Sequence, residues 1–197
     1  GTIVPKVIDF GIAKATATDD GTALEPVSLQ TRADQVLGTP EYMSPEQMFS
    51  GGVDVDTRTD VYSLGVTLYE LLCGELPFDS RRLRGAGRDE LARILQDELP
   101  TQPSKRLSQV GGAALSARGG ERTVVQRAVA GELDWITLKA LAKRREDRYP
   151  SALALAEDLE RWLANEPVLA APPGRTYRLR KFVRRHRVAV TASSAVL

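Results

Sequence analysis

The segment TDVYSLGVTLYELLCG, residues 59–74, constrains the fold more than any other part of the chain. Apolar side chains recur in it at helical spacing and fill much of the opposite side, which is typical of a helix in the interior of a domain. Thr59 or Asp60 is expected to cap its start, and Gly74 followed by Pro77 ends it. The residues at helical spacing are Val61, Leu64, Leu68, Leu71 and Leu72, and Val66, Tyr69 and Cys73 fill much of the other side.

Most of the remaining regular structure is also predicted to be helical. Amphipathic helices are expected in RDELARILQDE (88–98), ELDWITLKALAK (132–143) and PSALALAEDLERWLANE (150–166), the last capped by Ser151. Residues 101–120 are interpreted as a low-complexity loop and PVLAAPPG, residues 167–174, as a linker. Only the β-branched residues 3–10 favour a strand. The predicted fold is therefore mainly α.

The residue counts exclude several kinds of site. A single cysteine, Cys73, excludes an internal disulfide framework, and a single histidine, His186, argues against zinc sites and against Ser-His-Asp or Cys-His catalysis. Within leucine-rich helices Cys73, Trp135 and Trp162 favour core packing over reactive or binding roles. The net charge of +1 hides an asymmetry, because residues 175–197 contain seven Lys/Arg and no Asp or Glu.

Five short motifs follow one another in a specific order. DFG, residues 9–11, ends an apolar run and precedes a long polar loop that reaches Glu46 in GTPEYMSPEQ. DVYSLGV then opens the central helix, GELPFD follows it, and KRREDRY precedes the last helix. DFG alone is a tripeptide that occurs often by chance and favours an aspartate in an ordinary turn at a strand end. Only the order and spacing of the five motifs together indicate a function.

With this series the chain resembles the C-terminal lobe of a protein kinase, and more narrowly the bacterial serine/threonine kinases of eukaryotic type. The resemblance covers residues 3–165, and the SPEQ motif and the basic tail are most similar to transmembrane members. It implies a mainly α lobe with a short β-hairpin at its N-terminal end, and ATP-dependent phosphorylation of serine and threonine hydroxyls in protein substrates.

The resemblance gives Asp9 the role of a Mg²⁺ ligand beside the phosphates of ATP, a task that suits a hard carboxylate oxygen. Phe10 would pack beneath it, and Gly11 would let the backbone turn. Residues 11–46 would form the activation segment. In it Thr31 is a candidate phosphorylation site or a solvated loop threonine, and Thr39 matches a threonine near the substrate site.

Three further residues are implied to be structural. Glu46 and Arg148 resemble a pair that ties the activation segment to the last helices through a bidentate contact. Asp60 resembles an aspartate that holds the catalytic-loop backbone, although plain capping of the helix is an alternative. No residue here is predicted to be the catalytic base.

The sequence contains no Gly-rich phosphate loop, strand lysine or His-Arg-Asp segment, which precede DFG in kinases of this type. Residues 1–165 are therefore expected to be part of a kinase domain, and the piece alone is expected to be inactive. A non-catalytic docking module, with a protein or a second kinase lobe as partner, is the alternative.

The C-terminal part combines the basic run RLRKFVRRHR with the uncharged VAVTASSAVL. This order is typical of the cytoplasmic side of a membrane span. Residues 166–187 are expected to form a juxtamembrane linker and residues 188–197 the start of a transmembrane helix, which would place the kinase domain in the cytoplasm of a single-pass membrane protein. A solvated amphipathic helix, a basic membrane anchor alone or a nucleic-acid-binding tail are alternatives, the last disfavoured by the acidic body.

Overall fold

The computed structural model describes residues 39–49, 56–109, 122–174, 176, 177 and 181. All of them belong to one of two compact units, Thr39–Leu197, while the other unit, Gly1–Gly38, lies outside the described residues together with the predicted β-hairpin. The described part of the chain is helical and contains no strand. Its elements are η1 (Pro40–Tyr42), α1 (Pro45–Phe49), α2 (Thr57–Cys73), α3 (Ser80–Gly85), α4 (Arg88–Asp97), α5 (Pro103–Gln109), α7 (Arg122–Val129), α8 (Glu132–Ala140), η2 (Arg145–Asp147) and α9 (Ala152–Leu163).

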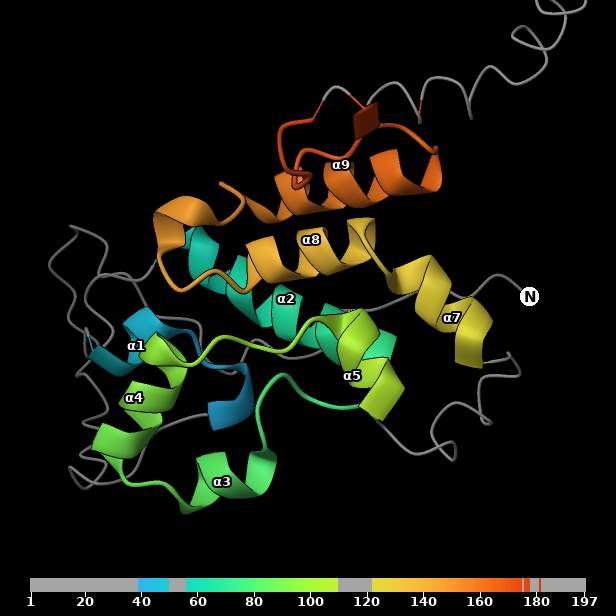
Figure 1. Cartoon of the computed structure of the whole chain (residues 1–197). Coiled ribbons are helices and arrows are strands. Elements are labelled where there is room, and N and C mark those ends of the chain that lie inside the picture. The colour runs from blue at the N-terminus through green and yellow to red at the C-terminus, as the bar shows by residue number, and fades with distance from the viewer. Residues whose placement is uncertain (1–38, 50–55, 110–121, 175, 178–180, 182–197) are drawn as a thin grey trace, which may run out of the picture. The chain divides into compact units, whose positions relative to one another are not determined.

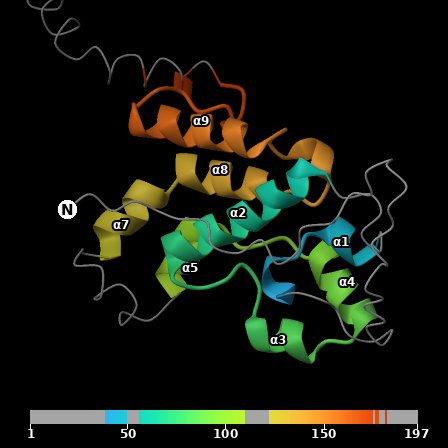
Figure 2. The same cartoon turned by 180° about the vertical axis from the view of Figure 1, so that it is seen from behind.

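Helix α2 is central, as its apolar sequence predicts. It contacts α5, α8 and α9, and α8 lies between α2 and α9 in both views of Figures 1 and 2. The helix is not buried all round, however, because Leu64 and Leu71 are exposed. The residues that face the core are Val61, Tyr62, Gly65, Val66, Tyr69 and Cys73. When apolar residues surround a helix, periodicity alone does not identify the face that its neighbours cover.

At the two ends of α2, the predicted N-cap is wrong and the predicted C-cap is confirmed. The cap is Asp56, whose Oδ1 accepts from the Arg58 N–H at 2.8 Å, so the expectation of Thr59 or Asp60 as the cap was wrong. At the other end Gly74 adopts a left-handed conformation with φ 76° and donates its N–H to the Glu70 carbonyl, as predicted.

The close crossing of α2 over α8 depends on a glycine, Gly65. A Cβ built on Gly65 would lie 2.8 Å from the Cβ of Ala140 and 3.2 Å from Cδ2 of Leu141. Two small residues, Gly65 and Ala140, therefore let the two helices approach closely at the centre of the core.

The predicted helices at 88–98, 132–143 and 150–166 correspond to α4, α8 and α9. Leu91, Ile94 and Leu95 of α4 are buried, and Ser151 caps α9 by accepting from the Ala154 N–H at 3.2 Å. The loop predicted at 101–120 was wrong for its first part, because Pro103–Gln109 forms α5. There Ser104 donates its N–H and Oγ to the buried Asp134, at 2.8 and 2.7 Å. This long-range anchor has no counterpart in the local sequence.

Residues 167–174, predicted to be a proline-rich linker, pack against the lobe. Val168 is buried in the core, and the N–H groups of Leu169 and Ala170 donate to Asp158 of α9. A carboxylate inside the preceding helix therefore holds the backbone of this segment against the lobe.

We expect Gly65→Ala to destabilise the chain by about 1–3 kcal/mol, because the added methyl group overlaps Ala140 at the helix crossing. Gly85→Ala is the matched control, since the described residues leave nothing within 4 Å of a Cβ built there, and it should change stability by less than about 0.5 kcal/mol. Urea denaturation of both variants measures the difference, and equal effects would contradict the close crossing.

Candidate functional site

The structure places only some of the predicted functional residues. Asp9, Phe10, Gly11 and Thr31 lie outside the described residues. The other four, Thr39, Glu46, Asp60 and Arg148, are described. Thr39 is exposed just before η1 and Asp60 is exposed in the first turn of α2, whereas Glu46 and Arg148 meet although they are 102 positions apart.

Arg148 follows η2, and its guanidinium makes two parallel hydrogen bonds to the carboxylate of Glu46 in α1. Nη1 donates to Oε1 at 2.6 Å and Nη2 donates to Oε2 at 2.8 Å. The Arg148 side chain is 0% exposed and that of Glu46 is 14% exposed. The fork geometry of this buried pair requires an arginine rather than a lysine.

The remaining donors of Arg148 are satisfied by three carbonyl groups. Nε donates to Ala142 at 2.7 Å, Nη1 to Arg58 at 3.0 Å and Nη2 to Lys143 at 3.0 Å. The guanidinium also lies over the ring of Tyr62, 5.0 Å from its centroid. All five N–H groups of the guanidinium are thereby used. One side chain joins α1, the start of α2 and the turn after α8.

Burial alone would raise the pKa of Glu46, but the hydrogen bonds and charge of Arg148 and a hydrogen bond from Thr59 lower it below its ordinary value. Thr59 Oγ1 donates to Glu46 Oε1 at 2.9 Å. The carboxylate is therefore held in its charged form. The Glu46–Arg148 pair is therefore a structural contact. It fixes the segment that contains Thr39 and Glu46, and it contains no group that would react with a substrate.

A second contact fixes the same segment further along α2. Tyr42 donates its hydroxyl to Glu70 Oε2 at 2.6 Å, and Ser63 Oγ donates to the Tyr42 carbonyl at 2.9 Å. The hydrogen bond to Glu70 raises the pKa of Tyr42 to about 12, with burial as the next cause. The segment 39–49 is thus attached to α2 at two points, Tyr42 and Glu46.

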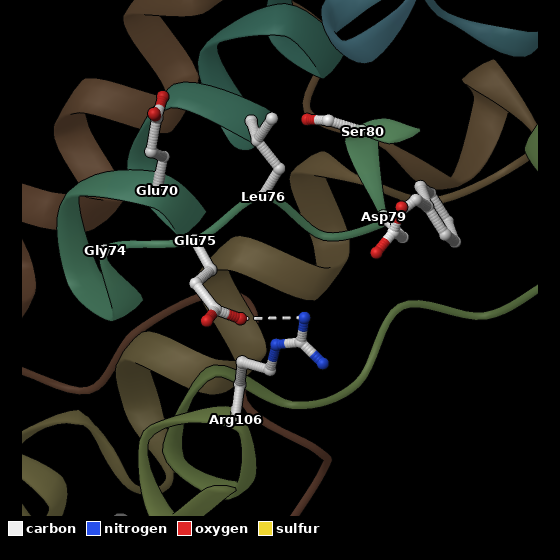
Figure 3. A pocket seen from close by; sticks show the side chains of 8 residues that line it. Glu70, Gly74, Glu75, Leu76, Asp79, Ser80 and Arg106 are labelled. Carbon is white, nitrogen blue, oxygen red and sulfur yellow. Dashed lines mark ion pairs between the residues drawn. The ribbon is translucent and has the colours of Figure 1, made fainter. Parts of the chain in front are cut away.

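Glu70 also lines a hollow between the end of α2 and the start of α3 (Figure 3). Glu75 and Arg106 face each other across it in an ion pair of 2.8 Å. The lining residues are Glu70, Gly74, Glu75, Leu76, Phe78, Asp79, Ser80 and Arg106, so most of it comes from the GELPFD motif. The hollow is acidic and each of its carboxylates Glu70, Glu75 and Asp79 already accepts a contact from within the lobe.

Sequence reasoning missed two buried aspartates that organise the lobe. Asp134 in α8 holds α5, and Asp158 in α9 accepts from the Tyr149 hydroxyl at 2.7 Å as well as from the segment after α9. Both side chains interrupt otherwise apolar helix faces, and this was the signal that could have identified them. Cys73, Trp135 and Trp162 pack in or against the core, as predicted.

Within the described ranges, no group of His, Cys, Asp and Glu side chains has the arrangement of a metal site. Asp9, the predicted ligand, is not among these residues. Among the helices of the described part, none is long and apolar enough to cross a membrane, and residues 188–197 lie outside that part.

Comparison with known proteins identifies the lobe. The protein kinase domain family matches residues 2–154. The chain belongs to the protein kinase family. It is similar to bacterial serine/threonine kinases, and its mainly α lobe is the C-terminal lobe of the kinase fold.

Three curated relatives give the range of this similarity. The serine/threonine-protein kinase pkn3 of Myxococcus xanthus is 40% identical over 156 residues, which cover 79% of this chain and 23% of the relative. PknB of Mycobacterium tuberculosis is 38% identical over 162 residues (82% and 21%), and Pkn1 of Myxococcus xanthus is 38% identical over 168 residues (84% and 19%). The chain thus spans about a fifth of the length of these relatives.

We expect Glu46→Gln to destabilise the chain by about 3–5 kcal/mol, because it leaves the buried Arg148 without a compensating charge. Glu146→Gln is the matched control: its side chain is 53% exposed and pairs with exposed or half-buried arginines, so its loss of stability should be far smaller than that of Glu46→Gln. Urea denaturation at neutral pH provides both values.

The Glu46–Arg148 pair also predicts how the stability of the chain depends on pH. Because the pKa of Glu46 is lower in the folded chain than its ordinary value of 4.5, its contribution is fully present above pH 4.5 and is lost as the pH falls through the lowered pKa. The stability difference between wild type and Glu46→Gln should therefore shrink below pH 4.5. A difference that stays constant down to about pH 3 would contradict the charged pair.

Proposed function

We propose that this chain is the part of a serine/threonine protein kinase that carries the Mg²⁺-binding motif, the activation segment and the helical support of the C-terminal lobe. The parent protein would transfer the γ-phosphate of ATP to serine and threonine hydroxyls of protein substrates. The observation that carries this proposal is the family match over residues 2–154, which includes Asp9, Phe10 and Gly11 in the order that kinases use.

The lobe supports this assignment through the way it holds the segment after the polar loop. The Tyr42–Glu70 and Thr59–Glu46 hydrogen bonds attach residues 39–49 to α2, and the Glu46–Arg148 pair attaches them to the turn after η2. A fixed segment suits a reaction that depends on positioning, since phosphoryl transfer needs little covalent chemistry from the protein. Thr39 is exposed on this segment, where a substrate could reach it.

The residues of this chain would supply only part of the groups that phosphoryl transfer needs. Asp9 would hold Mg²⁺, and Phe10 and Gly11 would set its position, while bound Mg²⁺ would neutralise charge on the transferred phosphoryl group. Phosphorylation of Thr31 would add a charge capable of ordering the activation segment. No residue of the printed sequence fits the role of catalytic base, so we expect these 197 residues alone not to transfer phosphate.

The test compares the chain with the complete product of its gene. The complete protein should transfer labelled phosphate from Mg·ATP to a serine- or threonine-containing protein, and the 197-residue chain should not.

Asp9→Asn in the complete protein should lower kcat at least about 100-fold because the metal ligand is lost. Asp19→Asn, in the polar loop, is the matched control and should retain activity. Transfer unaffected by Asp9→Asn would refute the assigned role, and an inactive complete protein would favour a docking module.

The C-terminal residues 175–197 are proposed to attach the protein to a membrane, with the basic run on the cytoplasmic side. The six arginines among residues 175–197, with no acidic residue beside them, would bind anionic headgroups at about 1 kcal/mol each. In flotation experiments the 197-residue chain should rise with vesicles of anionic phospholipid, less so at high salt, and a chain ending at residue 174 should not. Equal flotation of both chains would contradict this attachment.

A further inference from the structure

The residues after α9, 167–181, are called the strap here; the structure describes all of them except 175 and 178–180. In Figures 1 and 2 the described part turns back over α9 (orange to red). Its first anchor is Asp158, which is 0% exposed and accepts from the N–H of Leu169 at 2.5 Å and of Ala170 at 2.9 Å. Val168, 5% exposed, fills the core beside them.

The second anchor lies on α8. The rings of Tyr177 and Trp135 form a T-shaped pair with centroids 5.6 Å apart and planes at 85°, and the Tyr177 hydroxyl accepts from the Val168 N–H at 3.0 Å. Tyr177 thereby joins the α8 surface to the start of the strap. Burial is the first cause that raises the pKa of Tyr177, to about 12, as expected for a hydroxyl placed inside a contact.

The third anchor is an ion pair at the end of the strap. Lys181 Nζ lies 2.7 Å from Glu132 Oε2, with the side chains 8% and 17% exposed. A lysine from the most basic part of the chain is thus withdrawn from solvent and paired with the first residue of α8. A buried lysine requires an acidic partner, so the Lys181–Glu132 ion pair is a specific contact between the strap and α8. Pro172 and Pro173 reduce the conformational freedom that docking removes.

We propose that the α8–α9 face is a receptor for the chain's own juxtamembrane segment, and that the docked strap shortens the tether between the kinase lobe and the apolar C-terminal run. This extends the membrane attachment proposed above and rests on it for its biological meaning. The receptor residues are Glu132, Trp135 and Asp158.

The shortening follows from the chain length. Between Lys181 and Val188 there are six residues, which span at most about 25 Å, whereas the whole stretch from Asn165 to Val188 would span at most about 80 Å. For flexible chains the typical separations are about 15 Å and about 30 Å. A lobe held by the strap would act only on substrates close to the membrane surface, with the α8–α9 face toward the anchor.

The experiment uses the 197-residue chain in solution, without vesicles or ATP, so that its failure is distinguishable from failure of the kinase or membrane proposals. Trp135 and Trp162, the two tryptophans of the chain, lie in α8 and α9 and serve as fluorescence donors. A dansyl acceptor is attached through Val188→Cys under native conditions, where Cys73 is buried. Hydrogen exchange of the Leu169 and Ala170 amides is measured in parallel.

Lys181→Met and Asp158→Asn release the two ends of the strap, and Lys105→Met and Glu157→Gln, both exposed, are their matched controls. We expect Lys181→Met to lower energy transfer about twofold, and Asp158→Asn to speed exchange of the two amides at least about tenfold. Near-wild-type circular dichroism establishes that a variant is folded; if Asp158→Asn does not fold, Lys181→Met alone decides. Energy transfer unchanged by Lys181→Met, or Leu169 and Ala170 amides that exchange in wild type at the rate of an unfolded chain, would overturn the proposal.

Discussion

The interaction on which the described lobe depends is the buried pair of Glu46 and Arg148. Arg148 uses all five of its N–H donors, two on Glu46 and three on backbone carbonyls of two otherwise separate segments. A buried guanidinium tolerates no missing partner, because each unpaired donor in the interior is costly. The positions of α1, the start of α2 and the turn after α8 are therefore set together, and with them the segment that carries Thr39.

Elsewhere in the lobe, two buried carboxylates accept hydrogen bonds from backbone N–H groups of other segments. Asp134 fixes α5 through Ser104, and Asp158 fixes the segment after α9 while it accepts from Tyr149. Tyr149 directly follows Arg148, so the residue that binds Asp158 and the residue that binds Glu46 lie next to each other in the chain. Charged groups in the core thus position irregular segments that hydrophobic packing alone would leave unspecified.

The fold was predictable where local chemistry decides. The apolar length of residues 59–74 and the left-handed Gly74 predicted α2, and Ser151 predicted the start of α9, because caps and periodicity act within a few residues. The short helix α5 was not predicted, since Asp134 stabilises it from 30 positions away. The exposed Leu64 and Leu71 show the same limit: a helix that is apolar all round does not specify which face its neighbours bury.

The sequence by itself determined the family of this protein, because the order of the DFG, GTPEYMSPEQ, DVYSLGV, GELPFD and KRREDRY motifs is a property of the linear chain. It also determined that Glu46 and Arg148 were candidates for a pair. Only the tertiary structure decided how that pair is satisfied and that Val168, Leu169 and Ala170 belong to the lobe. The physical reason is that a buried charge is stable only with partners around it, and those partners come from segments whose proximity is created by folding.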